Sequence, residues 1–249
     1  LVNNTTASNN TGLGFCSLGA NTTGTPNVAV GYQALLANTT GANNAAVGYN
    51  TLCSNTTGAT NSAFGNYALF KNTTANDNNA FGYNALALNL TGTNNVAMGR
   101  NALLNNTTAS SNTAVGFNSL CANTTGATNS AVGYSALAAN ITGTDNTAIG
   151  TEALLASTTG STNTALGQRA LKCNTTGTGN ISVGSWSLQN NTTGSNNTTI
   201  GKGSLFTNST ADNNTAVGYY ALFANTSGTE NVAVGINTLK TNTTGGYNT

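Results

Sequence analysis

Charge is the scarcest property of this chain of 249 residues: six Lys and Arg and five Asp and Glu make up 4% of it, against about 25% in an average soluble domain. There is no His, and Pro, Met and Trp occur once each. A net charge of +1 excludes a basic surface for nucleic acid, and apolar runs of a few residues exclude a membrane span. The chain has no His and few carboxylates, so it lacks the side chains that general acid–base catalysis, catalytic triads and zinc sites require. We therefore expect no enzyme, no catalytic residue, no metal and no cofactor.

A strict repeat is what the sequence has instead: the same glycine recurs at every seventeenth position, without insertion or deletion. In every copy an Asn stands four residues before this Gly and an apolar residue stands directly before it. Ala, Ser or Thr follows three residues after the Gly and Leu four residues after it, and Leu1 fits the leucine column. The unit reads Asn-x-Ala-Val-Gly-Tyr-x-Ala-Leu-x-x-Asn-Thr-Thr-Gly-x-x. The repeat glycines are Gly14, Gly31, Gly48, Gly65, Gly82, Gly99, Gly116, Gly133, Gly150, Gly167, Gly184, Gly201, Gly218 and Gly235.

This period predicts one repeat array over residues 1–249, because so short a unit can bury a core only by stacking on copies of itself. We expect an all-β parallel β-solenoid, or β-roll, of about fourteen coils that is a segment of a longer fibre. Asn27–Gly31 reads as a short strand and Asn-Thr-Thr-Gly as a turn. Tyr-x-Ala-Leu fits either a second strand or one helical turn. The apolar residue before the glycine and the Leu after it are expected to form two core columns.

The Asn four residues before each repeat glycine, the strand asparagine, is expected to form a structural ladder through its side-chain amide. Ala usually stands two residues after it, so the column seldom matches a glycosylation signal. The strand asparagines are Asn10, Asn27, Asn44, Asn61, Asn78, Asn95, Asn112, Asn129, Asn146, Asn163, Asn180, Asn197, Asn214 and Asn231.

The Asn seven residues after the glycine, the turn asparagine, carries the signal of an N-glycosylation acceptor. The next position varies and the one after is always Thr or Ser. The alternative is a turn in which the hydroxyls bond locally, which crowding between coils about 4.8 Å apart favours. Ser157 is the one exception in the column. The candidates are Asn4, Asn21, Asn38, Asn55, Asn72, Asn89, Asn106, Asn123, Asn140, Asn174, Asn191, Asn208, Asn225 and Asn242.

The remaining polar and aromatic residues are interpreted as structural. Cys53 and Cys121 stand in one column four coils apart, too far for a disulfide, and all four cysteines are expected to be small core or half-buried residues. The charged residues read as scattered and solvated. An aromatic column follows the glycine and favours packing against a partner chain over sugar binding; its members are Phe15, Tyr32, Tyr49, Tyr83, Phe117, Tyr134 and Tyr219.

Asn146–Gly150 and Asn231–Gly235 resemble the repeated strand motif in the heads of trimeric autotransporter adhesins. Asn214–Leu222 is similar to repeats of phage tail-fibre-like and other extracellular fibrous proteins. The resemblance implies a parallel β-roll, often trimeric, at a cell or virion surface.

We accordingly expect the shaft of an extracellular fibril or adhesin, with or without covalent glycans. Its partners would be copies of itself, joined end to end or in a homotrimer, and it would have no nucleic-acid partner and no membrane span. An ice-binding β-solenoid and a carbohydrate-binding fibre are the alternatives.

Overall fold

The computed structural model describes residues 3–249, so Leu1 lies outside the described residues. This range contains fourteen strands and no helix, which confirms the all-β parallel solenoid with one sequence repeat per coil. The strands are β1 (Thr11–Leu13), β2 (Asn27–Val30), β3 (Asn44–Val47), β4 (Ser62–Phe64), β5 (Asn79–Phe81), β6 (Val96–Met98), β7 (Thr113–Val115), β8 (Ser130–Val132), β9 (Thr147–Ile149), β10 (Thr164–Leu166), β11 (Ile181–Val183), β12 (Thr198–Ile200), β13 (Thr215–Val217) and β14 (Val232–Val234).

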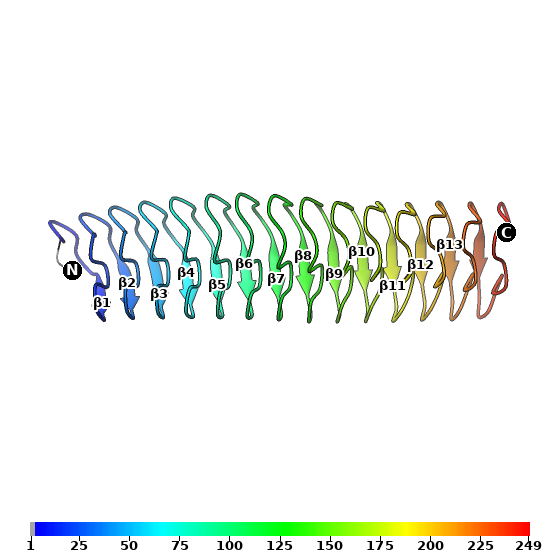
Figure 1. Ribbon diagram of the computed structural model, residues 1–249, viewed down its shortest axis with the longest axis horizontal. Helices are drawn as coiled ribbons and strands as arrows, with labels where there is room; N and C mark the ends of the chain where they lie inside the picture. Colours follow the sequence, from blue (N-terminus) through cyan, green and yellow to red (C-terminus); the bar gives the residue numbers. More distant parts are fainter. Residues whose placement is uncertain (1–2) are drawn as a thin grey trace. The chain divides into compact units, whose positions relative to one another are not determined.

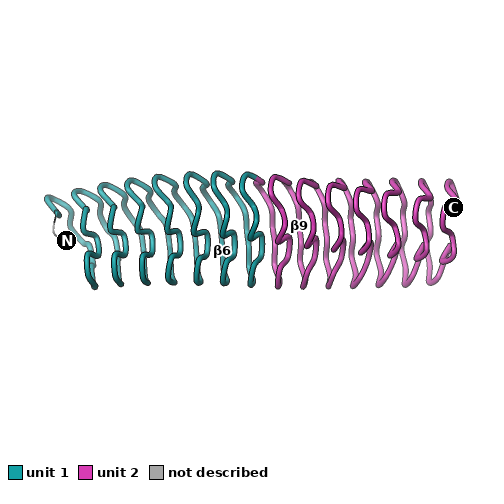
Figure 2. Tube along the Cα trace, in the orientation of Figure 1, with its two compact units in different colours: residues 1–125 teal, residues 126–249 magenta. Residues whose placement is uncertain are grey.

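The chain forms two compact units, unit 1 with Leu1–Thr125 and unit 2 with Gly126–Thr249 (Figure 2). Within unit 1, strands β1 to β7 pair in sequence order, and within unit 2, strands β8 to β14 do the same. Each pairing is parallel and joins equivalent residues of successive repeats, such as Ala46 and Ala63. Figure 1 shows that every strand runs beside its neighbours in the unit and that the rest of the coil returns to start the next strand.

The core of each coil is made of one Leu and small residues. The Leu four residues after the repeat glycine is fully buried from Leu18 to Leu222. The Ala two residues before the glycine and the Ala three residues after it are buried as well, as Ala63 and Ala68 illustrate. Because one layer supplies mainly Ala and the other supplies Leu, the two sides of a coil can approach closely.

The apolar residue before the repeat glycine does not lie in the core, which corrects one of the two predicted core columns. Phe64, Met98 and Ile200 are 38%, 45% and 45% exposed. The reason is strand alternation: the Ala one residue earlier points inward, so its neighbours on both sides point outward. Each unit therefore carries a half-exposed apolar row on its strand face.

The segment one to six residues after the glycine, the return segment, is neither a strand nor a helical turn. Two of its residues, two and four after the glycine, have left-handed backbone conformations, with φ of +52° at Asn50 and +51° at Leu52. Alternating left-handed residues interrupt both an α-helix and an extended strand. The return segments still bond from coil to coil, since the Leu35 amide donates to the Thr51 carbonyl (3.0 Å) and the Leu52 amide to the Ala68 carbonyl (3.1 Å).

Candidate functional site

The strand asparagines form a buried hydrogen-bond ladder within each unit. The backbone amide and the Nδ2 of Asn44 both donate to Oδ1 of Asn27 in the preceding coil, at 2.9 and 3.2 Å. Asn44 Nδ2 also donates to the Gly58 carbonyl at the other end of its own coil, at 2.8 Å. The same side chain therefore joins two coils and closes one of them.

The turn asparagines form a second buried ladder beside the first. Nδ2 of Asn55 donates to Oδ1 of Asn38 in the preceding coil (2.9 Å) and to the Gly58 carbonyl (2.9 Å). The Gly58 carbonyl thus accepts from both Asn columns. Since a buried polar group without a partner costs about 1–3 kcal/mol, these amides specify both the register of the coils and the closure of each one.

The turn asparagines that were predicted as glycan acceptors lie inside the coils. Both hydrogens of Nδ2, the atom that would carry the sugar, are used in hydrogen bonds, as at Asn55, and the residues of the inner coils are fully buried. A glycan would replace one of these hydrogens, and glycosylation at these positions stays a prediction. The fully buried candidates are Asn21, Asn38, Asn55, Asn72, Asn89, Asn106, Asn123, Asn140, Asn174, Asn191, Asn208 and Asn225.

Asn4 and Asn242 are the two candidates that are not buried. Nδ2 of Asn4 donates to the Ala7 carbonyl, and Nδ2 of Asn242 donates to Asn225 and to the Gly245 carbonyl, each at 2.9 Å. The local turn, which was the alternative to glycosylation, accounts for the Asn-x-Thr pattern at these positions too.

Ser157 interrupts the turn-asparagine ladder of unit 2. Its side chain is fully buried and its Oγ has no hydrogen-bond partner, because the shorter side chain reaches neither neighbouring coil. In the next coil, Asn174 Nδ2 donates to the Gly177 carbonyl at 3.0 Å.

We expect Ser157→Asn to raise the free energy of unfolding by about 2 kcal/mol, because it adds buried amide hydrogen bonds worth about 1 kcal/mol each. Thermal and denaturant unfolding would measure the gain. The matched control is Asn191→Ser, which removes bonds of 2.8 Å to Asn174 and to the Gly194 carbonyl and should lower stability by a similar amount. A Ser157→Asn variant no more stable than the parent would contradict the role assigned to the ladder.

The two Thr of Asn-Thr-Thr have different environments. The first is half-buried and bonds to the next coil, as when Thr39 Oγ1 donates to the Thr56 carbonyl at 3.1 Å. The second is exposed, as at Thr40 and Thr57. Each coil therefore presents one outward hydroxyl in this column, and the other hydroxyl serves the fold.

The aromatic column is exposed, and in unit 1 its rings stack on one another. Phe15, Tyr32 and Tyr49 have ring centroids 5.4 and 5.1 Å apart and nearly parallel planes. Stacked rings cover one another's faces, which are the surfaces that a sugar ring would use. Carbohydrate binding through this column stays a prediction.

The four cysteines are free, and three of them are half-buried. Burial raises the pKa of the Cys53 and Cys121 thiols. Cys16 is exposed, which corrects the expectation for that residue.

The charged residues are not scattered, and this is the feature that the sequence interpretation missed. All six cations lie in return segments, and four of the five acids lie at the positions eleven and twelve residues after the repeat glycine, which we call the loop pair. The signal was present in the alignment of the copies. The cations are Lys71, Arg100, Arg169, Lys172, Lys202 and Lys240; the loop-pair acids are Asp77, Asp145, Asp212 and Glu230.

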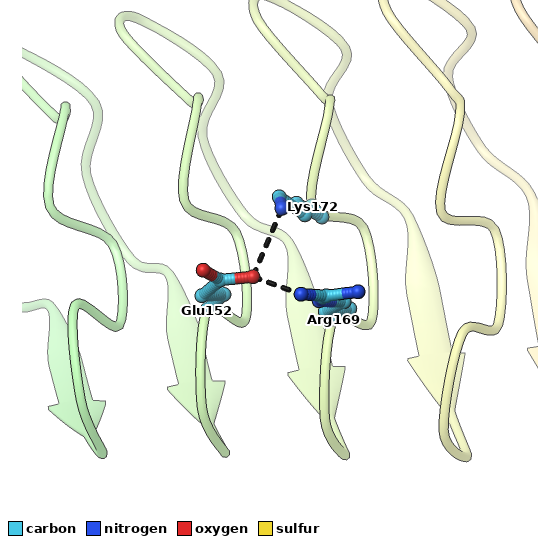
Figure 3. Close-up of polar contacts among 3 residues, drawn as sticks. All are labelled: Glu152, Arg169 and Lys172. Atoms are coloured by element: carbon cyan, nitrogen blue, oxygen red, sulfur yellow. Dashed lines mark hydrogen bonds and ion pairs between the residues drawn. The ribbon is translucent and has the colours of Figure 1, made fainter.

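Glu152 is the one acid on a return segment, and it is paired. Its Oε2 accepts from Arg169 Nε at 2.8 Å and from Lys172 Nζ at 2.9 Å, both in the next coil (Figure 3). The hydrogen bonds from Lys172 and Arg169 lower the pKa of the Glu152 carboxyl. The return segments of unit 2 carry four cations and this single acid, so their net charge is positive.

We expect the Glu152 carboxyl to titrate below the usual range of Glu, and Lys172→Gln to move its pKa back up. A carboxyl whose pKa is lowered by folding adds stability above its unfolded pKa, and this stability is lost as the pH falls through the folded pKa. NMR titration of the side-chain carboxyl carbon in the parent, the Lys172→Gln variant and a Lys202→Gln control would measure the shift. An unchanged pKa in Lys172→Gln would contradict the assigned cause.

Residues 3–249 contain no pocket, no cluster of three potential metal ligands and no helix long and apolar enough to cross a membrane. Comparison with models of known protein families, with curated proteins and with solved structures finds no match to the chain.

Proposed function

We propose that this chain is a structural, non-catalytic shaft of an extracellular fibril or adhesin at a cell or virion surface. The observation that carries the proposal is the set of hydrogen-bond ladders that run from coil to coil in each unit, with both Asn columns buried in the inner coils. Such a stack gains rigidity along the direction in which the coils repeat. The resemblance of the strand motif to repeats of adhesin heads and tail fibres supports the same interpretation.

Self-association is part of this proposal. The strand face of each unit carries a half-exposed apolar row, including Phe81 and Met98 in unit 1 and Ile149 and Ile200 in unit 2. A row of exposed apolar side chains like this one is typical of protein–protein contacts. It supports assembly with further copies, either side by side, as in a homotrimer, or in a fibre.

Ice binding is the second candidate, favoured by the exposed Thr column. One hydroxyl per coil at a spacing of about 4.8 Å gives a regular row. The neighbouring Thr column is half-buried and bonded to backbone carbonyls, as at Thr39, so it does not add a second free row. A thermal-hysteresis assay tests this candidate, and ice shaping by the protein would favour it over the fibre.

Negative-stain electron microscopy of the native material tests the proposed function. We expect filaments or regular bundles whose long axis follows the stacking of the coils. Isolated compact particles under all conditions would contradict a structural shaft.

A further inference from the structure

The opposite charges of unit 2 lie on different segments of the coil. Its return segments carry Arg169, Lys172, Lys202 and Lys240 with the single acid Glu152, a net charge of +3. Its loop pairs carry Asp145, Asp212 and Glu230 and no cation, a net charge of −3. Around a coil these segments are separated on one side by the strand and on the other by the Asn-Thr-Thr-Gly turn. The two surfaces are therefore distinct, and their charges are equal in magnitude and opposite in sign.

Two of the four cations of the basic surface, Lys202 and Lys240, lie over aromatic rings. Lys202 Nζ lies 4.9 Å from the centroid of the Trp186 ring, and Lys240 Nζ lies 5.5 Å from that of Tyr220. Tyr220 in turn contacts the ring of Phe223, with centroids 4.8 Å apart. A Lys above a ring covers the face that a sugar would stack on. The ion pairs of the described residues include neither Lys202 nor Lys240. The surface is thus suited to a partner with fixed negative charge.

The charges of the acidic surface are held by the preceding coil. Oδ1 of Asp212 accepts from the Ser195 amide at 2.6 Å, and Asp145 accepts from the Thr128 hydroxyl. Hydrogen bonds from Thr128 and Thr144 lower the pKa of Asp145, so that this carboxyl stays ionised over a wider pH range. Glu230 is exposed.

We infer that the acidic loop pairs of one copy bind the basic, aromatic return segments of a second copy of this chain. Charge complementarity between two surfaces of one molecule is the argument, since a +3 and a −3 surface attract each other across copies. The contact joins two different surfaces, so a pair of copies keeps one free surface of each kind and growth can continue sideways. Aromatic side chains and a charged rim are typical of protein interfaces. This inference rests on the proposed fibre and specifies how its copies meet laterally.

Sedimentation velocity at about 0.01 M and about 1 M salt, where the Debye length is about 30 and 3 Å, tests the contact. We expect the native chain to associate at low salt and to dissociate at high salt. Lys202→Gln with Lys240→Gln should weaken association about tenfold, and Asp212→Asn with Glu230→Gln should do the same. Mixing these two double variants should restore association, mainly as pairs, because each retains only one complementary surface.

Thr159→Asp with Thr193→Asp is the matched control. It changes the net charge by the same two units as the double Lys variant, but on the exposed Thr column, and should associate like the native chain. Equal weakening by this control would show an effect of net charge and overturn the inference. So would undiminished association of the double Lys variant, or binding of an acidic polysaccharide by a chain that does not associate with itself.

Failure of this contact is distinguishable from failure of the proposed function. Filaments in the microscope whose lateral association is unaffected by salt and by these variants would overturn the contact alone. Absence of filaments together with salt-dependent pairs would overturn the shaft alone.

Discussion

Replacing Gly167 by Ala is expected to lower the free energy of unfolding by about 4 kcal/mol, because strain of about 1–3 kcal/mol and overpacking of about 1–3 kcal/mol add. The backbone of Gly167 has φ of +135°, and a Cβ atom there would lie 2.7 Å from both the carbonyl carbon and the oxygen of Gly184 in the next coil. Thermal and denaturant unfolding followed by circular dichroism would measure the loss.

Gly179→Ala is the matched control within the same unit. Gly179 also has a positive φ, +68°, but Asn occupies the corresponding position at Asn196 and Asn213 with a similar backbone. The nearest atom to an added Cβ is the side-chain oxygen of Asn196, which can move. We expect a loss of about 1 kcal/mol. Equal losses in the two variants would contradict the close approach of neighbouring coils at the repeat glycines.

Leu137→Asp is expected to unfold the coils around it, because it places an unpaired charge in the apolar column between two neighbouring Leu. Leu137 is fully buried, and truncating or charging such a site costs about 3–5 kcal/mol. Thr159→Asp introduces the same charge on an exposed residue and should change stability by less than about 0.5 kcal/mol. Protease cleavage within unit 2 and the melting temperature would separate the variants. Similar melting temperatures would mean that the leucine column is not the core.

The strict period of the sequence was sufficient to predict the solenoid, its parallel register and the leucine column. It was not sufficient to predict which apolar residue of the strand faces inward. Phe64 is the larger candidate, but the core between the two layers is narrow enough that Ala63 fills it and Phe64 points out. Hydrophobicity alone could not distinguish these positions, since the thickness of the core depends on the layer opposite.

The conformation of the return segment could not be predicted from the sequence either. Leu rarely adopts a positive φ, so the value of +50° at Leu154 has no local signal. Burial of the Leu side chain and hydrogen bonds to the next coil offset the strain, and both exist only in the stack. The same holds for the turn asparagines: Asn-x-Thr is compatible with a glycan acceptor and with a hydrogen-bond ladder, and the burial of residues such as Asn55 exists only in the stack.

X-ray fibre diffraction from aligned native material tests the central claim most directly. If the chain is a shaft in which coils stack along the fibre, a strong reflection at about 4.8 Å, the spacing between hydrogen-bonded strands, should lie on the meridian, parallel to the fibre axis. Material that forms no fibres, or fibres whose reflection at about 4.8 Å lies perpendicular to their axis, would contradict the account.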